Sequence, residues 1–306
     1  MYCIGIFLFY FSAVKQWDVI IIGGGLAGLT AAIHLAQNKL SVLVFERHKY
    51  PMHKVCGEYV SNEIIPYLNF LKVDLTTLKL PAINELLITT PSGKEINQTL
   101  PLGGFGISRY AFDDLLYQKA QQEGVKFIFE KVTDVNQTEA SYQVKTQHQE
   151  QYANLVLGSF GKRSNLDLAF KRNFVRKPAH WVGIKAHYSH PDFPKNKVAL
   201  HNFEGGYCGL SLTETNQVNL CYLAKYESFK KFKNITDFNE KVLKKNPHLA
   251  KFLNEATLEF DQHLAIAQVS FEAKKAVENS MLMLGDAAGL IHPLCGNGMA
   301  MAIHSA

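Results

Sequence analysis

Trp17-Asp-Val-Ile-Ile-Ile-Gly-Gly-Gly-Leu-Ala-Gly-Leu-Thr30 is the most informative stretch of this sequence. Its first part, 17–22, is mostly apolar and predicts a buried strand. Gly23, Gly25 and Gly28 follow as a G-x-G-x-x-G pattern, and the apolar residues beyond them recur at helical spacing. Because the pattern lies between a strand and a helix, it predicts a turn that binds the pyrophosphate of a dinucleotide.

Each glycine of the pattern has its own physical role. Gly23 permits a tight turn, Gly25 lets the backbone approach a pyrophosphate, and Gly28 lets the helix pack closely on the strand. Leu26 and Ala27 are the first residues of the expected helix, where free N–H groups and a partial positive charge attract phosphate. A glycine-rich turn without any ligand is the alternative, and the strand and helix around the pattern disfavour it.

An acidic residue completes this first unit. A second apolar run, 41–45, ends at Glu46, which is 18 positions after Gly28. A carboxylate there accepts hydrogen bonds from a ribose diol and repels a 2′-phosphate. This favours FAD or NAD over NADP, and the neighbouring Arg47 is a further candidate for cofactor contact.

A motif near the C-terminus favours FAD over NAD. The apolar run 281–284 leads into Gly285 and Asp286, and an Asp just after a strand can bind a ribityl hydroxyl. A helix start follows, whose amides can stabilise negative charge on a reduced flavin ring. An ordinary strand and loop with an Asp cap is the alternative. The helix start consists of Gly296, Asn297, Gly298 and Met299.

These paired motifs resemble the para-hydroxybenzoate hydroxylase-like flavoproteins, and most of all their geranylgeranyl reductase-related branch. Three further segments carry the resemblance. In 54–61, Cys56 and Gly57 resemble the Cys-Gly loop that lies near the flavin in that branch. Arg109, in the Arg-x-x-Phe-Asp-x-x-Leu pattern, matches an arginine that reaches FAD, and Gly161 belongs to a motif that borders FAD.

The resemblance implies an α/β fold, in which a Rossmann-type FAD-binding domain is interwoven with an antiparallel-sheet substrate domain. It extends from about Trp17 to the last residue. The expected division is an apolar N-terminal extension, 1–16; a discontinuous FAD-binding domain, 17–80, 101–178 and 270–306; and a substrate domain, 81–100 and 179–269.

Three departures from the family pattern bear on the reaction. Phe160 stands where the family has an Asp, which puts NADPH use in that groove in doubt. The Tyr-x-Trp-x-Phe-Pro signature of prenyl reductases is absent, and 206–211 stands in its place. Relatives continue with further helices beyond the one that begins at Met299, so we expect the chain to be incomplete at its C-terminus.

Two cysteines are the catalytic candidates. Cys56 is either a proton donor or a residue that packs beside the flavin, and packing is the favoured reading. Cys295 has the same two possible roles, and it lies at a helix start, where a thiolate is stabilised. Tyr59, Tyr207 and His292 fit structural roles better and are not predicted to be catalytic.

Composition is typical of a globular enzyme of the cytoplasm. The chain has 306 residues, 47% of them hydrophobic, and a net charge of +5. Its five cysteines form no C-x-x-C pair, and its histidines show no H-x-x-x-H or H-E-x-x-H spacing, so no metal is predicted. The sequence has no basic patch interleaved with aromatic residues, so nucleic-acid binding is not predicted. The lysines of 225–251 predict a solvated face, with an anionic membrane surface as the alternative.

The N-terminal residues, 1–14, are apolar and uncharged but too short for a spanning helix, which needs roughly 20 residues. A loosely attached extension is the favoured interpretation. An anchor at the membrane surface is the alternative, and it would suit a lipid substrate.

Three functions fit these features. The first is a reductase or dehydrogenase that passes hydride through FAD to or from an apolar, prenyl- or polyketide-type small molecule. NAD(P)H or another electron donor would bind transiently, because no second G-x-G-x-x-G is present. The second is a monooxygenase that hydroxylates an aromatic or polyketide product. The third is an inactive flavin-binding fragment. The oligomeric state is not predicted.

Overall fold

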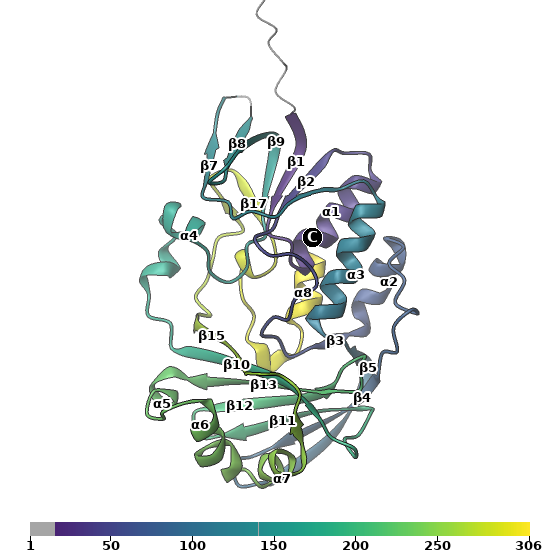
Figure 1. Cartoon of the computed structure of the whole chain (residues 1–306), viewed down its shortest axis with the longest axis vertical. Helices are drawn as coiled ribbons and strands as arrows, with labels where there is room; N and C mark the ends of the chain where they lie inside the picture. Colours follow the sequence, from purple (N-terminus) through teal and green to yellow (C-terminus); the bar gives the residue numbers. More distant parts are fainter. Residues whose placement is uncertain (1–15, 140) are drawn as a thin grey trace, which may run out of the picture.

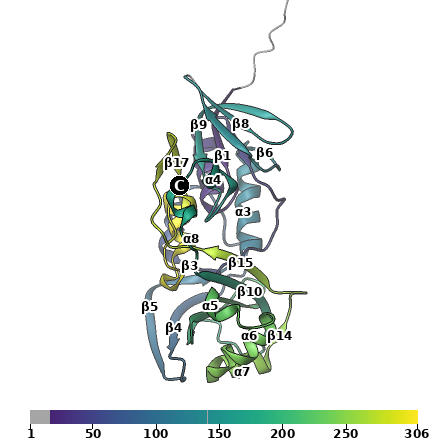
Figure 2. The same cartoon turned by 90° about the vertical axis from the view of Figure 1, so that its left-hand side faces the viewer.

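Two β-sheets, one above the other, organise the computed structural model, which describes residues 16–139 and 141–306 (Figures 1 and 2). The first sheet lies at the end where the chain begins, with helices α1 and α3 beside it. The second lies at the opposite end, with α5, α6 and α7 on its outer side. This mixed α/β arrangement confirms the predicted fold class.

The first sheet has eight strands with a parallel centre, in the order β16-β17-β9-β1-β2-β6; β8 pairs with β9 and β7 with β8. Ile20 and Ile21 of β1 are fully buried, because layers of side chains cover both faces of a parallel strand. The strands are β1 (Gln16–Ile22), β2 (Val42–Phe45), β6 (Lys126–Ile128), β7 (Asp134–Gln137), β8 (Tyr142–Lys145), β9 (Glu150–Gly158), β16 (Val277–Glu278) and β17 (Met281–Met283).

Helices cover both faces of this sheet. On one face, Leu29 and Ile33 of α1 pack with Leu116 of α3 and Ile303 of α8 in a single core. The other face carries a second core, to which Leu166 of α4 contributes. The helices of this part are α1 (Leu26–Gln37), α2 (Ile65–Phe70), α3 (Arg109–Gln122), α4 (Asn165–Ala169) and α8 (Gly298–Ser305).

The second sheet has nine strands, in the order β14-β10-β13-β12-β11-β4-β5-β3, with β15 also paired to β10. All pairs are antiparallel except β4 with β11. The strands are β3 (Tyr59–Ser61), β4 (Ala82–Thr89), β5 (Glu95–Gly106), β10 (Trp181–Ser189), β11 (Lys197–Phe203), β12 (Gly206–Leu212), β13 (Val218–Lys225), β14 (Thr257–Leu258) and β15 (Leu264–Val269).

The two faces of the second sheet differ in chemistry. On β10, Val182, Ile184 and Ala186 join the core under the outer helices. Because side chains alternate along a strand, Lys185 and His187 point to the other face, toward the first sheet's loops. The outer helices are α5 (Tyr226–Phe229), α6 (Ile235–Lys241) and α7 (Pro247–Glu255).

The predicted domain division remains a prediction. Two elements bear on it: β5 runs through the expected boundary at 100/101, and β3 joins the second sheet from within 17–80. The predicted N-terminal extension lies outside the described residues except for Gln16, which begins β1. In the described part of the chain, no helix combines the length and apolarity needed to cross a bilayer.

Candidate flavin site

The glycine-rich turn has the tight geometry that the sequence predicts. Gly23 has φ of +106°, and a Cβ there would lie 2.4 Å from the Ser159 carbonyl oxygen. A Cβ on Gly28 would lie 2.0 Å from the Gly23 carbonyl oxygen, so only glycine allows α1 to pack this closely. At Gly25 the nearest atom to a Cβ is an Arg109 guanidinium nitrogen, 3.7 Å away, which leaves room for a phosphate beside a positive charge.

A charged group built on α3 supplies that positive charge. Arg109 donates from Nε and from a terminal nitrogen to Asp113, at 2.7 and 2.8 Å, and Lys54 donates to the same carboxylate at 2.7 Å. Burial alone would raise the pKa of Asp113, but the charges of Arg109 and Lys54 outweigh it and lower the pKa. Two cations therefore share one anion, and the net charge facing Gly25 is positive.

Glu46 lies at the edge of the glycine-rich turn, as expected for a ribose ligand. Its carboxylate accepts the Gly24 N–H at 2.9 Å and the His48 N–H at 3.2 Å. Each carboxylate oxygen has a second lone pair for a hydroxyl donor. Arg47 is exposed on the surface.

Tyr50 is a neighbour of this turn that the sequence analysis missed. Its hydroxyl donates to the Gly24 carbonyl oxygen at 2.6 Å, and its ring stacks on Tyr117 with centroids 4.4 Å apart. Burial, followed by the nearby Glu46 charge, raises the pKa of Tyr50. The phenol is therefore a neutral donor that fixes the turn, and only its position four residues after Glu46 could have indicated it.

The C-terminal motif meets the glycine-rich turn in space. β17 pairs with β9, which pairs with β1, so Gly285 lies beside α1, and a Cβ on it would be 3.1 Å from the Ala27 Cβ. Among the described residues, no hydrogen bond or ion pair reaches the Asp286 carboxylate. It is therefore available to a ribityl hydroxyl, the role that the sequence analysis predicts for it.

Lys274 ties two of the predicted cofactor segments together. Its ammonium donates to the carbonyl oxygens of Lys162 and Asp286, at 2.8 and 2.6 Å. Burial lowers the pKa of Lys274 to about 8. Gly161, next to Lys162, has φ of +82°, and a Cβ on it would meet no atom within 4 Å.

The start of α8 presents an unused acceptor. Asn297 donates from its side chain to Glu63 at 2.9 Å, while its Oδ1 is buried and has no partner among the described residues. Gly296 has φ of +65°, and Gly298 begins the helix, whose second residue, Met299, is buried. An orphaned acceptor at a helix N-terminus fits a ring that offers an N–H and accumulates negative charge, as a flavin does.

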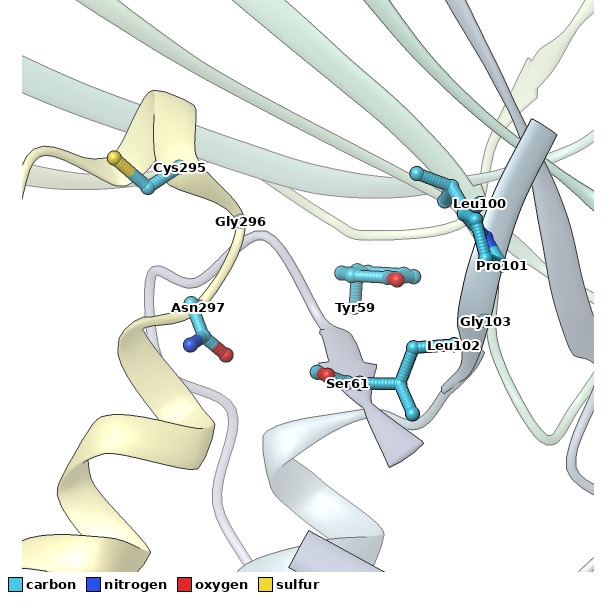
Figure 3. Close-up of a pocket in the computed structure, with 9 residues that line it drawn as sticks. All are labelled: Tyr59, Ser61, Leu100, Pro101, Leu102, Gly103, Cys295, Gly296 and Asn297. Carbon is cyan, nitrogen blue, oxygen red and sulfur yellow. The ribbon is translucent and has the colours of Figure 1, made fainter. Parts of the chain in front are cut away.

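The two predicted catalytic cysteines lie on different segments. Cys56 is half-buried, and its carbonyl oxygen accepts a hydrogen bond from Asn219 of β13 at 3.1 Å. Cys295 is exposed, and its Sγ points away from the Tyr59 ring (Figure 3). It lines a cavity of about 260 Å³, together with Tyr59, Ser61, Leu100, Pro101, Leu102, Gly103, Gly296 and Asn297.

A buried polar cluster beside Cys56 was also missed. It places three possible metal-ligand atoms, from His53, Glu58 and His187, within 4.8 Å of one another. These residues do not have the H-x-x-x-H spacing that would have indicated them in the sequence. Lys185 forms an ion pair with the same Glu58 carboxylate. The available signal was a Lys and a His two positions apart in the otherwise apolar strand β10.

A family model described as an FAD binding domain matches residues 16–306. The chain belongs to the FAD binding domain family. It is therefore an FAD-dependent oxidoreductase, as the sequence predicts. The open space at Gly25, the Asn297 acceptor and the Asp286 carboxylate, which has no partner in the described part of the chain, fit that cofactor.

The relatives of this flavoprotein include a reductase, a brominase and an uncharacterized protein. It is 24% identical over 316 residues to digeranylgeranylglycerophospholipid reductase of Methanococcus vannielii, covering 94% of this chain and 74% of the relative. It is 27% identical over 179 residues to an uncharacterized protein of Methanosarcina barkeri, covering 56% of this chain and 44% of that protein. The chain thus spans less than half of this last relative.

Solved structures share the fold at lower identity. A flavin-dependent brominase superposes with a TM-score of 0.77 and 20% identity, covering 95% of this chain and 76% of the other. At this identity the likeness concerns the fold alone. The expected relation to reductases of the geranylgeranyl type is confirmed at the level of family, and the reaction is taken up below.

Proposed function

We propose that this flavoprotein is a reductase or dehydrogenase, which transfers hydride through FAD to or from an apolar substrate of the prenyl or polyketide type. The observation that carries this proposal is an aromatic group where the loop before α8 meets the second sheet. His292 lies 4.7 Å from Phe271, 6.1 Å from Tyr207 and 6.4 Å from Trp181, between ring centroids.

This aromatic group gives the sheet an apolar end. Trp181, Tyr207 and Leu223 alternate with residues of the outer core on β10, β12 and β13, so they lie on the face toward the first sheet. Burial raises the pKa of Tyr207, and the nearby thiols raise it further, so its phenol stays neutral. A face of this kind excludes water and accepts a hydrocarbon or an aromatic ring.

The residues that would hold FAD have separate tasks. FAD supplies the hydride chemistry when bound. The turn at Gly23 and Gly25, with Arg109, would bind the pyrophosphate, and Glu46 would bind the adenosine ribose. Asp286 would bind the ribityl chain. The α8 N-terminus would stabilise negative charge on the flavin ring.

The thiols of Cys56 and Cys295 are the proposed proton donors to the substrate. Cys56 lies on the loop that adjoins the second sheet, and Cys295 lies one turn before α8. Either thiol could hold the proton that a reduced double bond requires. NAD(P)H or another donor would supply electrons transiently, since the sequence has no second G-x-G-x-x-G. Phe160, at the position of the family's Asp, counts against NADPH in that groove.

Contact with an anionic membrane surface would suit a lipid substrate and is the alternative to a solvated lysine-rich face. In the lysine-rich segment 225–251, several lysines already pair with an acid three or four positions earlier, for example Lys241 with Asp237 at 2.6 Å. This pairing favours a solvated face, and a vesicle-binding assay with anionic lipids would test the alternative.

The proposal is tested by reducing the purified holoenzyme without air and following its absorption spectrum. A reductase should reoxidise slowly in air, with no early adduct, and rapidly with an unsaturated prenyl lipid. An immediate flavin–oxygen adduct would contradict it and favour the monooxygenase alternative. Bound FAD that neither oxygen nor unsaturated lipids reoxidise would favour the inactive fragment.

A further inference from the structure

A buried ion pair lies where the Cys56 loop meets the second sheet. Glu58 and Lys185 are both fully buried, and the Lys185 ammonium donates to Glu58 Oε1. His187 Nε2 hydrogen-bonds Glu58 Oε2 at 2.7 Å. Burial alone would raise the pKa of Glu58, but Lys185 and His187 outweigh it and lower the pKa, so the carboxylate is charged.

Three neighbouring strands of the sheet hold the backbone of this loop. Lys185 of β10 donates to the Lys54 carbonyl oxygen at 3.2 Å. Asn219 of β13 donates to that of Cys56 at 3.1 Å, and Ser211 of β12 donates to that of Gly57 at 3.4 Å. The sheet thus offers a polar side chain to each of three carbonyl oxygens of the loop.

Glu58 also joins this row to the flavin site. Its Oε1 accepts the backbone N–H of Arg109 at 2.7 Å, at the first residue of α3. The Arg109 guanidinium is the group nearest Gly25. Glu58 itself has φ of +55°, a conformation that a non-glycine residue keeps only when its surroundings hold it there.

The cluster is better explained as a clamp on the loop than as a metal site. His53, Glu58 and His187 have suitable donor atoms, but the Lys185 ammonium already supplies the positive charge that a metal ion would bring. A second cation beside Lys185 would be repelled.

We propose that Lys185, His187 and Asn219 are positioning residues, which clamp the Cys56–Glu58 loop to the second sheet and thereby set the exposure of the Cys56 thiol and its place beside FAD. The part of this inference that concerns FAD rests on the proposed function; the clamp itself does not. The same strands carry the apolar end of the face at Trp181 and Tyr207, so substrate contact and loop position share one rigid support.

The test measures alkylation of single cysteines by iodoacetamide, with peptide mass spectrometry, in the full-length protein. Lys185→Met should raise the rate at Cys56 about tenfold or more, because a charged hydrogen bond that keeps the loop closed is lost. Cys208 is the internal control, since it is buried in the outer core of the same sheet and should not change. Lys185→Arg should restore most of the protection.

Asn219→Ala keeps the test decisive if Lys185→Met fails to fold, which simultaneous labelling of Cys208 would reveal. This variant removes only the bond to the Cys56 carbonyl and should raise Cys56 labelling about threefold or more. His201→Asn is the matched control, because His201 is a buried histidine of the same sheet that bonds Thr89 and does not contact the loop. It should leave Cys56 unchanged.

Two outcomes would overturn the inference: Cys56 labelling that is unchanged in both Lys185→Met and Asn219→Ala, or an equal rise in His201→Asn. The absorption spectrum of bound FAD gives a second readout, which should shift in Asn219→Ala but not in His201→Asn. A colourless wild-type protein would contradict the proposed function, while the labelling ratios would still test the clamp.

Discussion

Replacing Asp113 by Asn removes the anion that Lys54 and Arg109 share. The Asp113 side chain has no exposed surface, and it accepts three hydrogen bonds between 2.7 and 2.8 Å from these two cations. Breaking a buried pair from one side costs about 3 to 5 kcal/mol, because the remaining charges lose their partner in a poorly solvated place. Two cations stay behind here, so we expect the upper part of that range.

Urea unfolding measures this loss of stability, with Asp113→Asn compared against Asp114→Asn as a control variant. Asp114 is the adjacent residue on α3, is only half-buried and bonds Gln118 at the surface, so its replacement should change the free energy of unfolding by less than about 0.5 kcal/mol. Equal stability of the two variants would refute the reasoning, because it would mean that the Asp113 carboxylate is not needed to compensate the charges of both cations.

The same pair of variants has a defined pH dependence. The pKa of Asp113 is lowered in the folded protein, so its stabilising effect is present above the unfolded pKa, about 3.9, and is lost as pH falls through the folded pKa. The gap between wild type and Asp113→Asn should therefore be constant near pH 7 and should close only below about pH 4. A gap that closes already at pH 6 would point to a different group.

Three further predictions concern the cofactor segments. Gly28→Ala should abolish FAD retention on gel filtration, because the new Cβ would lie 2.0 Å from a carbonyl oxygen. Gly209→Ala is the control and should retain FAD, because no atom lies nearer than 3.7 Å to its new Cβ. Equal flavin content in the two variants would count against the tight turn. Asp286→Asn should leave the melting temperature of the apoprotein unchanged, since the Asp286 carboxylate has no partner in the described part of the chain. Fluorescence titration should show FAD binding weakened about tenfold or more. A lower melting temperature of the apoprotein would show a structural role instead. Lys274 has its pKa lowered to about 8, so the folded state binds fewer protons than the unfolded one between about pH 8 and 10.5, and stability should rise with pH across that window. Lys274→Met should flatten this rise, and an identical slope in the two proteins would exclude Lys274 as its source.

The first β-α-β unit could be predicted because local chemistry determines it. The strand at 17–22, the helix after Gly25 and the acid at 46 all occur within one residue of their expected places. Glycine leaves a strong signal in sequence, since nothing else fits where a Cβ would touch a carbonyl oxygen. Asp286 was singled out from its place just after a strand, and its role toward the cofactor stays a prediction.

The Glu58 cluster could not be predicted, because its members meet only through tertiary structure. Glu58 and Lys185 are separated by 127 positions, and neither belongs to a spacing motif. The pairing depends on the register of β10 and on the loop that reaches it from β3, and neither follows from apolar periodicity. Tyr50 escaped notice for the same reason, since its contact with Gly24 forms only when the loop after β2 folds back.

The place of β17 in the first sheet has a consequence for how this protein is made. β17 (Met281–Met283) pairs with β9, which itself pairs with β1, so a strand made long after β1 and β9 completes the sheet that they begin. Until residues 281–283 have been made, Leu157 and Gly158 at the end of β9 lack the β17 partner, and an open strand edge invites pairing with other chains. Flavin uptake should therefore follow the synthesis of β17, and nascent chains stopped before residue 281 should depend on chaperones to stay in solution.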